Sequence, residues 1–137
     1  MTTSTANPAV VTIDELLAAA RARIDRVPAP DLDAEVRAGA VVVDTRCADA
    51  RRDEGTIAGS VHVPLSVLLW RLDPSSGSAI EALADRQRRF ILVCADGYSS
   101  SLAAATLRDL GFERATDLAG GFRGWVEAGF PVERVAP

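Results

Sequence analysis

One cysteine of this chain lies in a setting that favours a nucleophilic role. Cys94 ends the apolar run FILVC and begins the loop CADGYSS, residues 94–100, which leads into a helix-forming segment. Backbone N–H groups that curl at the start of a helix form a nest that binds anions. Such a nest stabilises a thiolate, and Gly97 permits the backbone turn that the nest requires. We therefore expect a reactive thiolate at Cys94, and the alternative is an ordinary buried cysteine at a strand end.

The neighbouring segments are expected to place this cysteine at one edge of a sheet. AVVVDT and FILVC are continuous apolar runs, which are typical of parallel strands buried on both faces. Helices are expected at residues 12–24, 31–38, 65–72 and 79–85 and in SSLAAATLRDLG and GFRGWVEAG, and short strands in VHVP and ATDLAGG. Alternating strands and helices predict an α/β fold with an open parallel sheet. Sites in such sheets form beyond the carboxyl ends of the strands.

Composition excludes two classes of partner. The 137 residues, of which 48% are hydrophobic, suffice for one folded domain. The net charge of -4 argues against a nucleic-acid partner, because such binding needs a cationic surface. No run approaches the roughly 18 apolar residues of a membrane span, and MTTSTANPAV lacks a signal pattern. We expect a cytoplasmic protein with no membrane or nucleic-acid partner.

Cysteine and histidine usage predicts free thiols and no metal site. Cys47 and Cys94 lie far apart in a chain expected to stay in a reducing compartment, where structural disulfides are rare. Two cysteines and the single histidine, His62, lack the clustered spacing of a zinc site. We expect a structural role for His62 and a non-catalytic thiol at Cys47. The alternative for Cys47 is a disulfide that traps a persulfide on Cys94.

Five segments, in order and spacing, resemble the rhodanese family. FILVCADGYSSSLAAATLRDLGFERATDLAGGFRGWVEAGFPV is similar to the carboxyl half of a rhodanese domain in its strand-end cysteine, L-x-x-L-G-F segment, GG pair and W-x-x-A-G-x-P-V ending. VVVDTR and EGTIAGSVHVP resemble motifs of its first half. The resemblance spans about residues 25–132. It implies a rhodanese-like open parallel sheet of about five strands with helices on both faces.

The resemblance also sets the expected domain boundaries. A rhodanese domain is expected at residues 25–137, preceded by an extra helix at residues 12–24 and a flexible tail at residues 1–11. Thr12 and Glu15 have the spacing of a capping box at the start of that extra helix.

The activity that the resemblance implies is sulfur transfer. Cys94 would take a sulfane sulfur from a small donor, hold it as a persulfide and pass it to a thiol, to cyanide or to a protein thiol. The amides of the loop would stabilise the persulfide anion without a side-chain acid or base or a cofactor. These amides belong to Ala95, Asp96, Gly97, Tyr98, Ser99 and Ser100. The alternative is a non-catalytic rhodanese-like module that senses persulfide or binds other proteins.

The loop departs from the family pattern in its charge. Thiosulfate sulfurtransferases of this family have Arg or Lys late in the loop, where this chain has Ser99, and Asp96 adds a negative charge. We therefore expect weak use of dianionic thiosulfate and leave mercaptopyruvate and persulfide donors open. Arg71 is the first candidate for a substitute cation, and Arg46 and Arg51 are weaker ones.

Two further expectations concern neighbouring positions. Asp44 and Arg46 flank the carboxyl end of the first long strand and are expected to support the loop, Asp44 by hydrogen bonds to it. Five residues separate Cys94 from Ser100. At the position of Ser100, phosphatases and arsenate reductases of related fold need an arginine that binds the oxyanion. Phosphatase and arsenate chemistry are not expected.

Overall fold

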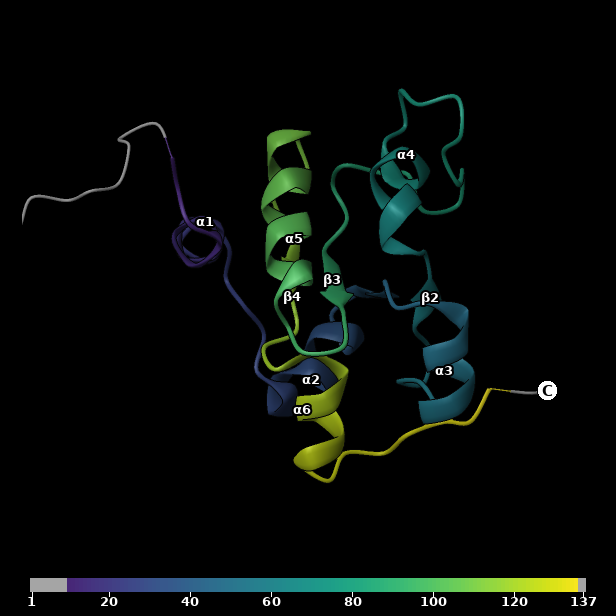
Figure 1. The fold of residues 1–137 in the computed structure, drawn as a ribbon. Coiled ribbons are helices and arrows are strands. Elements are labelled where there is room, and N and C mark those ends of the chain that lie inside the picture. Colours follow the sequence, from purple (N-terminus) through teal and green to yellow (C-terminus); the bar gives the residue numbers. More distant parts are fainter. Residues whose placement is uncertain (1–9, 136–137) are drawn as a thin grey trace, which may run out of the picture.

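The computed structural model describes residues 10–135, which form a four-stranded parallel sheet between layers of helices (Figure 1). The strands are β1 (Val41–Asp44), β2 (Val61–His62), β3 (Phe90–Val93) and β4 (Thr116–Asp117), in the order β2-β1-β3-β4. Beyond β4, Val27 makes a single parallel bridge to Leu118, at the place of a fifth strand. The predicted α/β fold with an open parallel sheet is confirmed. The tail expected at residues 1–11 falls mostly outside the described residues.

The helices follow the predicted order, with one helix added and the helix predicted at residues 79–85 not formed. They are α1 (Ile13–Arg21), α2 (Leu32–Arg37), α3 (Ala48–Glu54), α4 (Leu68–Leu72), α5 (Ser99–Asp109) and α6 (Gly121–Glu127). The capping box of Thr12 and Glu15 is present, although α1 ends at Arg21, three residues before the predicted end. Helix α3 is the added one and was not predicted from the sequence. Short 3-10 turns precede α2 and α4.

The helix predicted at residues 79–85 was wrong, because this segment folds as a series of turns. The amide of Ile80 donates to the carbonyl of Arg71 at 2.8 Å, and that of Leu83 donates to Ile80 at 2.9 Å. Leu83 is buried and Ile80 packs against the same core. Burial of these two side chains and the return of the chain to β3 therefore override the helix propensity of the segment.

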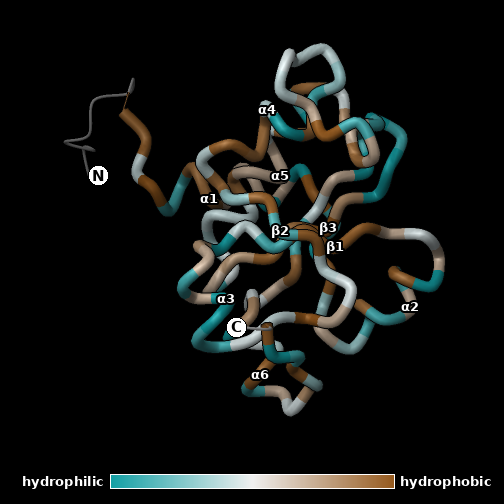
Figure 2. The backbone as a smooth tube through the Cα atoms, turned by 90° about the vertical axis from the view of Figure 1, so that its right-hand side faces the viewer, coloured by the Kyte–Doolittle hydropathy of each residue, from teal (hydrophilic) through white to brown (hydrophobic). Residues whose placement is uncertain are grey.

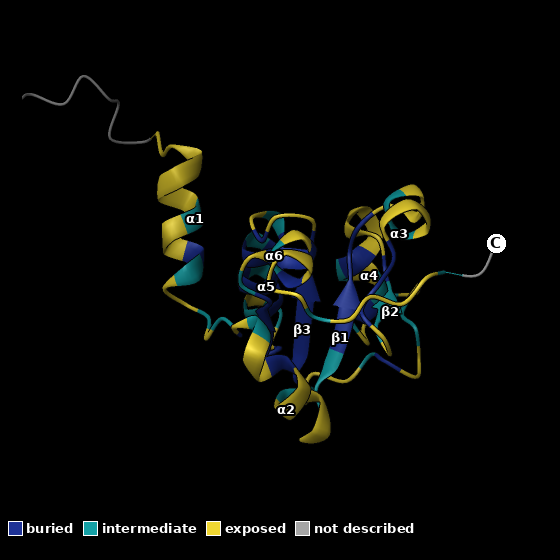
Figure 3. Ribbon diagram, turned by 90° about the horizontal axis from the view of Figure 1, so that it is seen from below, coloured by how far each residue is buried: buried dark blue, intermediate teal, exposed yellow. Residues whose placement is uncertain are grey.

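The sheet separates two hydrophobic cores, which explains the continuous apolar runs. Successive residues of β3 alternate between them: Phe90 and Leu92 face the core that includes α4 and α5, whereas Ile91 and Val93 face the core that includes α2 and α6. Figure 2 shows the hydrophobic segments gathered at β1 and β3, and Figure 3 shows both strands buried. Both faces of the sheet are therefore covered. No helix among residues 10–135 is long and apolar enough to cross a membrane.

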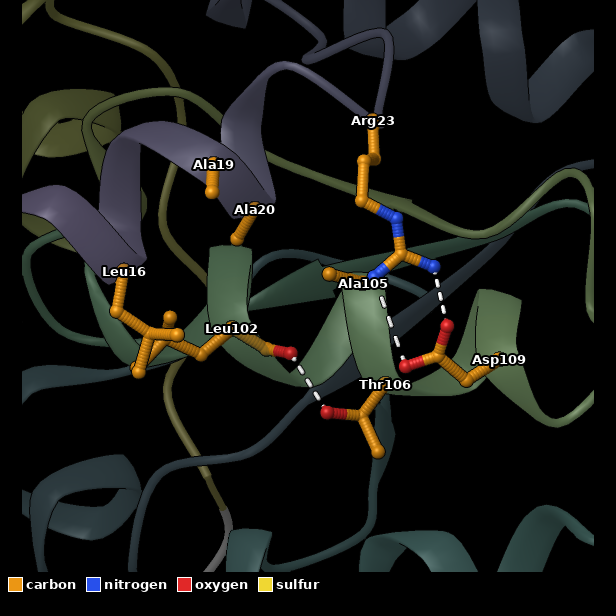
Figure 4. A pocket seen from close by; sticks show the side chains of 8 residues that line it. All are labelled: Leu16, Ala19, Ala20, Arg23, Leu102, Ala105, Thr106 and Asp109. Carbon is orange, nitrogen blue, oxygen red and sulfur yellow. Dashed lines mark hydrogen bonds and ion pairs between the residues drawn. The ribbon is translucent and has the colours of Figure 1, made fainter. Parts of the chain in front are cut away.

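Helix α1 packs on α5 and not on the sheet. It crosses α5 steeply, and most of its surface is exposed (Figures 1 and 3). In Figure 4, Leu16 and Ala20 of α1 face Leu102 and Ala105 of α5, and Arg23 reaches the carboxylate of Asp109 near the end of α5. The last turn of α1 therefore lies where its side chains can reach either end of α5.

Candidate active site

The loop between β3 and α5 curls around the sulfur of Cys94. Cys94 follows β3 directly and is 6% exposed. The backbone N–H of Gly97 donates to its Sγ at 3.1 Å, and Ser100 Oγ lies 3.2 Å from the same atom. Gly97 has a φ of +84°, and a Cβ there would lie 3.0 Å from the amide nitrogens of Gly120 and Gly121. This position therefore requires glycine.

The start of α6 holds the first residues of the loop. The amide of Phe122 donates to the carbonyl of Cys94 at 2.8 Å, and the amide of Arg123 donates to that of Ala95 at 2.9 Å. A Cβ on Gly121 would lie 2.7 Å from the Cys94 carbonyl oxygen and 2.6 Å from the Gly97 nitrogen. The loop and the Gly120–Gly121 turn therefore pack backbone against backbone.

These contacts lower the pKa of Cys94 below that of an ordinary thiol. Burial raises the pKa of Cys94, but the Ser100 and Ser99 hydroxyls and the Ser100 and Gly97 amides lower it, and together they outweigh the burial. The thiolate is therefore more populated at neutral pH than that of a free cysteine. This direction agrees with the nucleophile expected from the sequence.

A buried polar network lies behind the sulfur. The hydroxyls of Ser100 and Ser101 each donate to Oδ2 of Asp117 at 2.7 Å. Asp117 ends β4, its side chain is fully buried, and Arg26 pairs with it through Nε at 2.9 Å and Nη2 at 3.1 Å. A chain of contacts thus runs from Cys94 through Ser100 and Asp117 to Arg26.

Two arginines also hold the loop from the amino-terminal side. Nη2 of Arg21 donates to the carbonyl of Gly97 at 2.8 Å, and Nη2 of Arg26 donates to the same oxygen at 2.9 Å. Arg21, Arg26 and Asp117 were not predicted as site residues from the sequence. The one signal that could have found Asp117 is its place at the carboxyl end of a short predicted strand beside the cysteine strand.

The predicted support by Asp44 and Arg46 is indirect. Asp44 accepts hydrogen bonds from Arg46 Nη2 at 2.8 Å and Arg51 Nε at 3.2 Å. Among the described residues Asp44 makes no hydrogen bond to residues 94–100, so the predicted direct bond was wrong. The Arg46 guanidinium lies 3.8 Å from the centroid of the Phe122 ring. Because the Phe122 amide holds the Cys94 carbonyl, Asp44 and Arg46 reach the loop through Phe122.

The structure does not bring Arg71 to the loop. Its Nη1 donates to the carbonyl of Ser78 at 2.7 Å. Its neighbour Trp70 lines a surface hollow with Leu110, which follows the carboxyl end of α5, whereas Cys94 lies at the amino end of that helix. Arg51 pairs with Asp44 at 3.2 Å and, among the described residues, makes no hydrogen bond to residues 94–100.

The outer face of the loop is exposed, and its acidic residue has a partner. Asp96 pairs with Nη1 of Arg123 at 2.7 Å, and both side chains are accessible to solvent. Ala95 and Tyr98 are exposed and Ser99 is half-buried. The negative charge expected to repel an anionic donor is therefore offset by Arg123.

The remaining candidates take part in local structure. His62 Nε2 lies 2.7 Å from the carbonyl oxygen of Arg46. Cys47 is exposed and caps α3, with its Sγ accepting from the Ala50 amide at 3.5 Å, and both cysteines are free thiols. Within residues 10–135, no group of three or more His, Cys, Asp or Glu side chains is arranged to hold a metal ion.

Comparison with known proteins identifies the family. The rhodanese-like domain profile matches residues 28–128. The chain belongs to the rhodanese-like family. This rhodanese-like chain is 37% identical over 110 residues to the thiosulfate sulfurtransferase GlpE of Pseudomonas savastanoi pv. phaseolicola. The aligned region covers 80% of this chain and 93% of that protein. The family and fold expected from the sequence motifs are confirmed.

Two solved structures resemble the rhodanese-like chain along most of its length. A protein of unknown function from Rhodopseudomonas palustris, described as a possible tyrosine phosphatase, is 29% identical with a TM-score of 0.82, covering 95% of this chain and all of that one. The human single-domain sulfurtransferase TSTD1 is 25% identical with a TM-score of 0.63, covering 74% of this chain and 95% of that one. The family profile leaves α1, Arg21 and Arg26 outside its match.

Proposed function

We propose that this rhodanese-like protein is a sulfurtransferase that carries a sulfane sulfur on Cys94. The observation that carries the proposal is the Sγ of Cys94, held by the Gly97 amide at 3.1 Å in a loop that lowers the pKa of the thiol. The names of the GlpE relative and of human TSTD1 support the same reaction class.

The proposed reaction has two transfers. In the first, the Cys94 thiolate attacks the transferable sulfur of the donor, and the bond between that sulfur and the rest of the donor breaks. This is an S–S bond in thiosulfate or a persulfide and a C–S bond in mercaptopyruvate, and the rest of the donor leaves with the bonding electron pair. For thiosulfate this yields a Cys94 persulfide anion and sulfite. In the second, an acceptor thiolate or cyanide attacks the outer sulfur of the persulfide, and the Cys94 thiolate leaves. The loop amides stabilise the anion on sulfur at both stages.

Donor charge is where this chain differs most from a thiosulfate enzyme. Ser99 places no cation in the loop, and the charges of Asp96 and Arg123 offset each other. We propose that thiosulfate is used weakly relative to less charged donors. The second candidate function, a module that binds persulfide without turnover, is favoured by the same absence of a loop cation.

Phosphatase chemistry has less support. The loop position at which a phosphatase needs arginine is Ser100, whose hydroxyl is buried and donates to Asp117. An oxyanion would meet no guanidinium from that position.

Intact mass spectrometry tests the proposed intermediate. After incubation with thiosulfate, mercaptopyruvate or glutathione persulfide, the protein should gain about 32 Da for one persulfide sulfur, and cyanide should remove it as thiocyanate. Cys94→Ser should abolish the gain, whereas Cys47→Ser, at the exposed thiol, should retain it. Labelling lost only in the Cys47 variant would overturn the assignment. Loading by any donor without thiocyanate turnover would favour the binding module.

A further inference from the structure

Gly97 is held on both sides of its peptide backbone. Its amide donates to Cys94 Sγ, and its carbonyl accepts from Arg21 at 2.8 Å and from Arg26 at 2.9 Å. Two guanidinium groups that donate to one carbonyl oxygen fix the direction of that carbonyl. Because glycine can adopt many backbone conformations besides the one seen here, with φ of +84°, this restraint helps to keep the Gly97 amide on the sulfur.

We propose that α1 is part of the sulfur-transfer site, with Arg21 as a positioning residue that holds Gly97 against Cys94 and supplies the positive charge that the loop lacks at Ser99. This inference rests on the sulfurtransferase function proposed above. It assigns a role to a helix that the family profile does not cover.

The charges around the loop single out Arg21. Arg26 is neutralised by Asp117, and Arg123 by Asp96. Within residues 10–135, Arg21 makes no ion pair.

The contacts of Arg21 all lie on the loop or beside it. They are the Gly97 carbonyl, the Ser101 hydroxyl at 3.2 Å and the Tyr98 ring, whose centroid lies 5.6 Å from the guanidinium carbon. Among the arginines that contact the loop, Arg21 therefore carries the uncompensated positive charge. A positive charge beside a thiolate or a persulfide anion stabilises it.

A second arginine near the end of α1 allows the proposed role of Arg21 at the loop to be distinguished from docking of the helix on α5. Arg23, two residues after Arg21, pairs with Asp109 at the far end of α5, and within residues 10–135 it makes no hydrogen bond to the loop. Arg21 and Arg23 thus both tie α1 to the domain, but Arg21 alone of the two touches the residues around Cys94. Arg23 is therefore a matched control for loss of helix docking.

The test measures the alkylation rate of Cys94 against pH in the full-length chain, with Cys47→Ser as the background so that one thiol reacts. Arg21→Gln should raise the apparent pKa of Cys94 by about half a unit to one unit, because one uncompensated charge is lost at a partly buried site. Arg23→Gln should leave that pKa unchanged. Arg21→Lys keeps the positive charge, so the apparent pKa of Cys94 should stay close to that of the wild type. Lysine does not reproduce the two hydrogen bonds that the guanidinium donates to Gly97 and Ser101.

Steady-state kinetics with cyanide as acceptor give a second reading. Arg21→Gln should raise KM for thiosulfate more than KM for a less charged donor. An apparent pKa equal to wild type in Arg21→Gln, or an equal shift in Arg23→Gln, would overturn the proposal. Because alkylation requires no sulfur transfer, these outcomes stay distinct from failure of the proposed function, which would show as absent persulfide loading in wild type. Should Arg21→Gln fail to fold, Arg21→Lys decides. Because lysine keeps the positive charge, an apparent pKa of Cys94 in Arg21→Lys that rises by the half unit to one unit expected for Arg21→Gln would contradict the charge role.

Discussion

Two buried carboxylates, Asp44 and Asp117, lie at the ends of the strands on either side of β3. Both are at most 2% exposed, and both pair with arginine. Asp44 accepts from Arg46 and Arg51 and reaches the loop only through the Phe122 ring, whereas Asp117 accepts from Ser100, which contacts the sulfur. Burial and charge pairing are therefore alike at the two positions. The difference is the Ser100 hydroxyl, which joins Asp117 to the sulfur of Cys94.

The largest expected effect is on stability, where the two carboxylates should behave alike. Asp44→Ala and Asp117→Ala should each lower the free energy of unfolding by about 3–5 kcal/mol, because each removes a buried carboxylate that pairs with arginine. Asp117→Ala leaves Arg26 without an acidic partner, and Asp44→Ala leaves Arg46 only its pairing with the exposed carboxylate of Glu54 at 3.2 Å. The larger loss is expected for Asp44→Ala, since the Arg46 side chain is 3% exposed and that of Arg26 is 22% exposed. Urea denaturation followed by circular dichroism measures both. A loss below about 1 kcal/mol in either variant would contradict this view of the pairs.

The same two variants should differ in the reactivity of Cys94. Asp117→Ala removes a negative charge, frees the Ser100 hydroxyl to donate to sulfur and leaves Arg26 positive, so the pKa of Cys94 should fall. Asp44→Ala should leave that pKa unchanged. The rate of Cys94 alkylation as a function of pH, measured without urea, gives the apparent pKa of Cys94 in each variant. Equal shifts in the two variants would remove the distinction between the carboxylates.

A smaller effect is expected from two buried hydroxyls. Ser100→Ala and Thr45→Val each delete one, and Thr45 Oγ1 donates to the Val93 carbonyl at 3.1 Å beside Asp44. Each should cost about 1 kcal/mol of stability. Ser100→Ala should also raise the pKa of Cys94, because this hydroxyl lowers it in the wild type, and so slow alkylation at neutral pH. An equal slowing in Thr45→Val would show that the hydroxyl acts through packing alone.

The smallest effect is expected at the exposed carboxylate, which extends the comparison to the loop's outer face. Asp96→Asn should leave stability within about 0.5 kcal/mol of wild type. It frees Arg123, so activity with thiosulfate should rise by less than about fivefold, whereas Ser99→Arg, which adds a cation, should give up to about tenfold. Added salt should reduce both gains. Equal gains with thiosulfate and with a less charged donor would show that loop charge does not set specificity.

Local patterns predicted the parts of the fold that local sequence determines. The runs around Val42 and Ile91 predicted buried strands because AVVV and FILVC are continuous apolar stretches, and Thr12 with Glu15 predicted the start of α1. The sequence ADARRDE gave no signal for α3, because this helix buries no residue and its capping side chain is the thiol of Cys47. A helix without an apolar face leaves no periodicity to detect.

The candidate site was predictable only along one stretch of chain. Cys94, Gly97 and Ser100 lie in one loop, and their spacing suffices to predict a nucleophile. Arg21 reaches that loop across 76 positions, and Arg26 meets Asp117 across 91. Such contacts depend on how α1 docks on α5 and on the position of β4. No local pattern records either.

The loop does not hold the Gly97 carbonyl by itself, because the two guanidinium groups that donate to this carbonyl come from outside the loop. A chain cut back to residues 28–128, the span that the family profile recognises, would keep every residue of the loop and the cysteine itself. It would lack Arg21 and Arg26, whose guanidinium groups donate to the Gly97 carbonyl. Grafting CADGYSS onto a related scaffold would therefore transfer Cys94 without the two arginines that hold Gly97, and a graft that is to keep this restraint needs the segment that carries Arg21 and Arg26 as well.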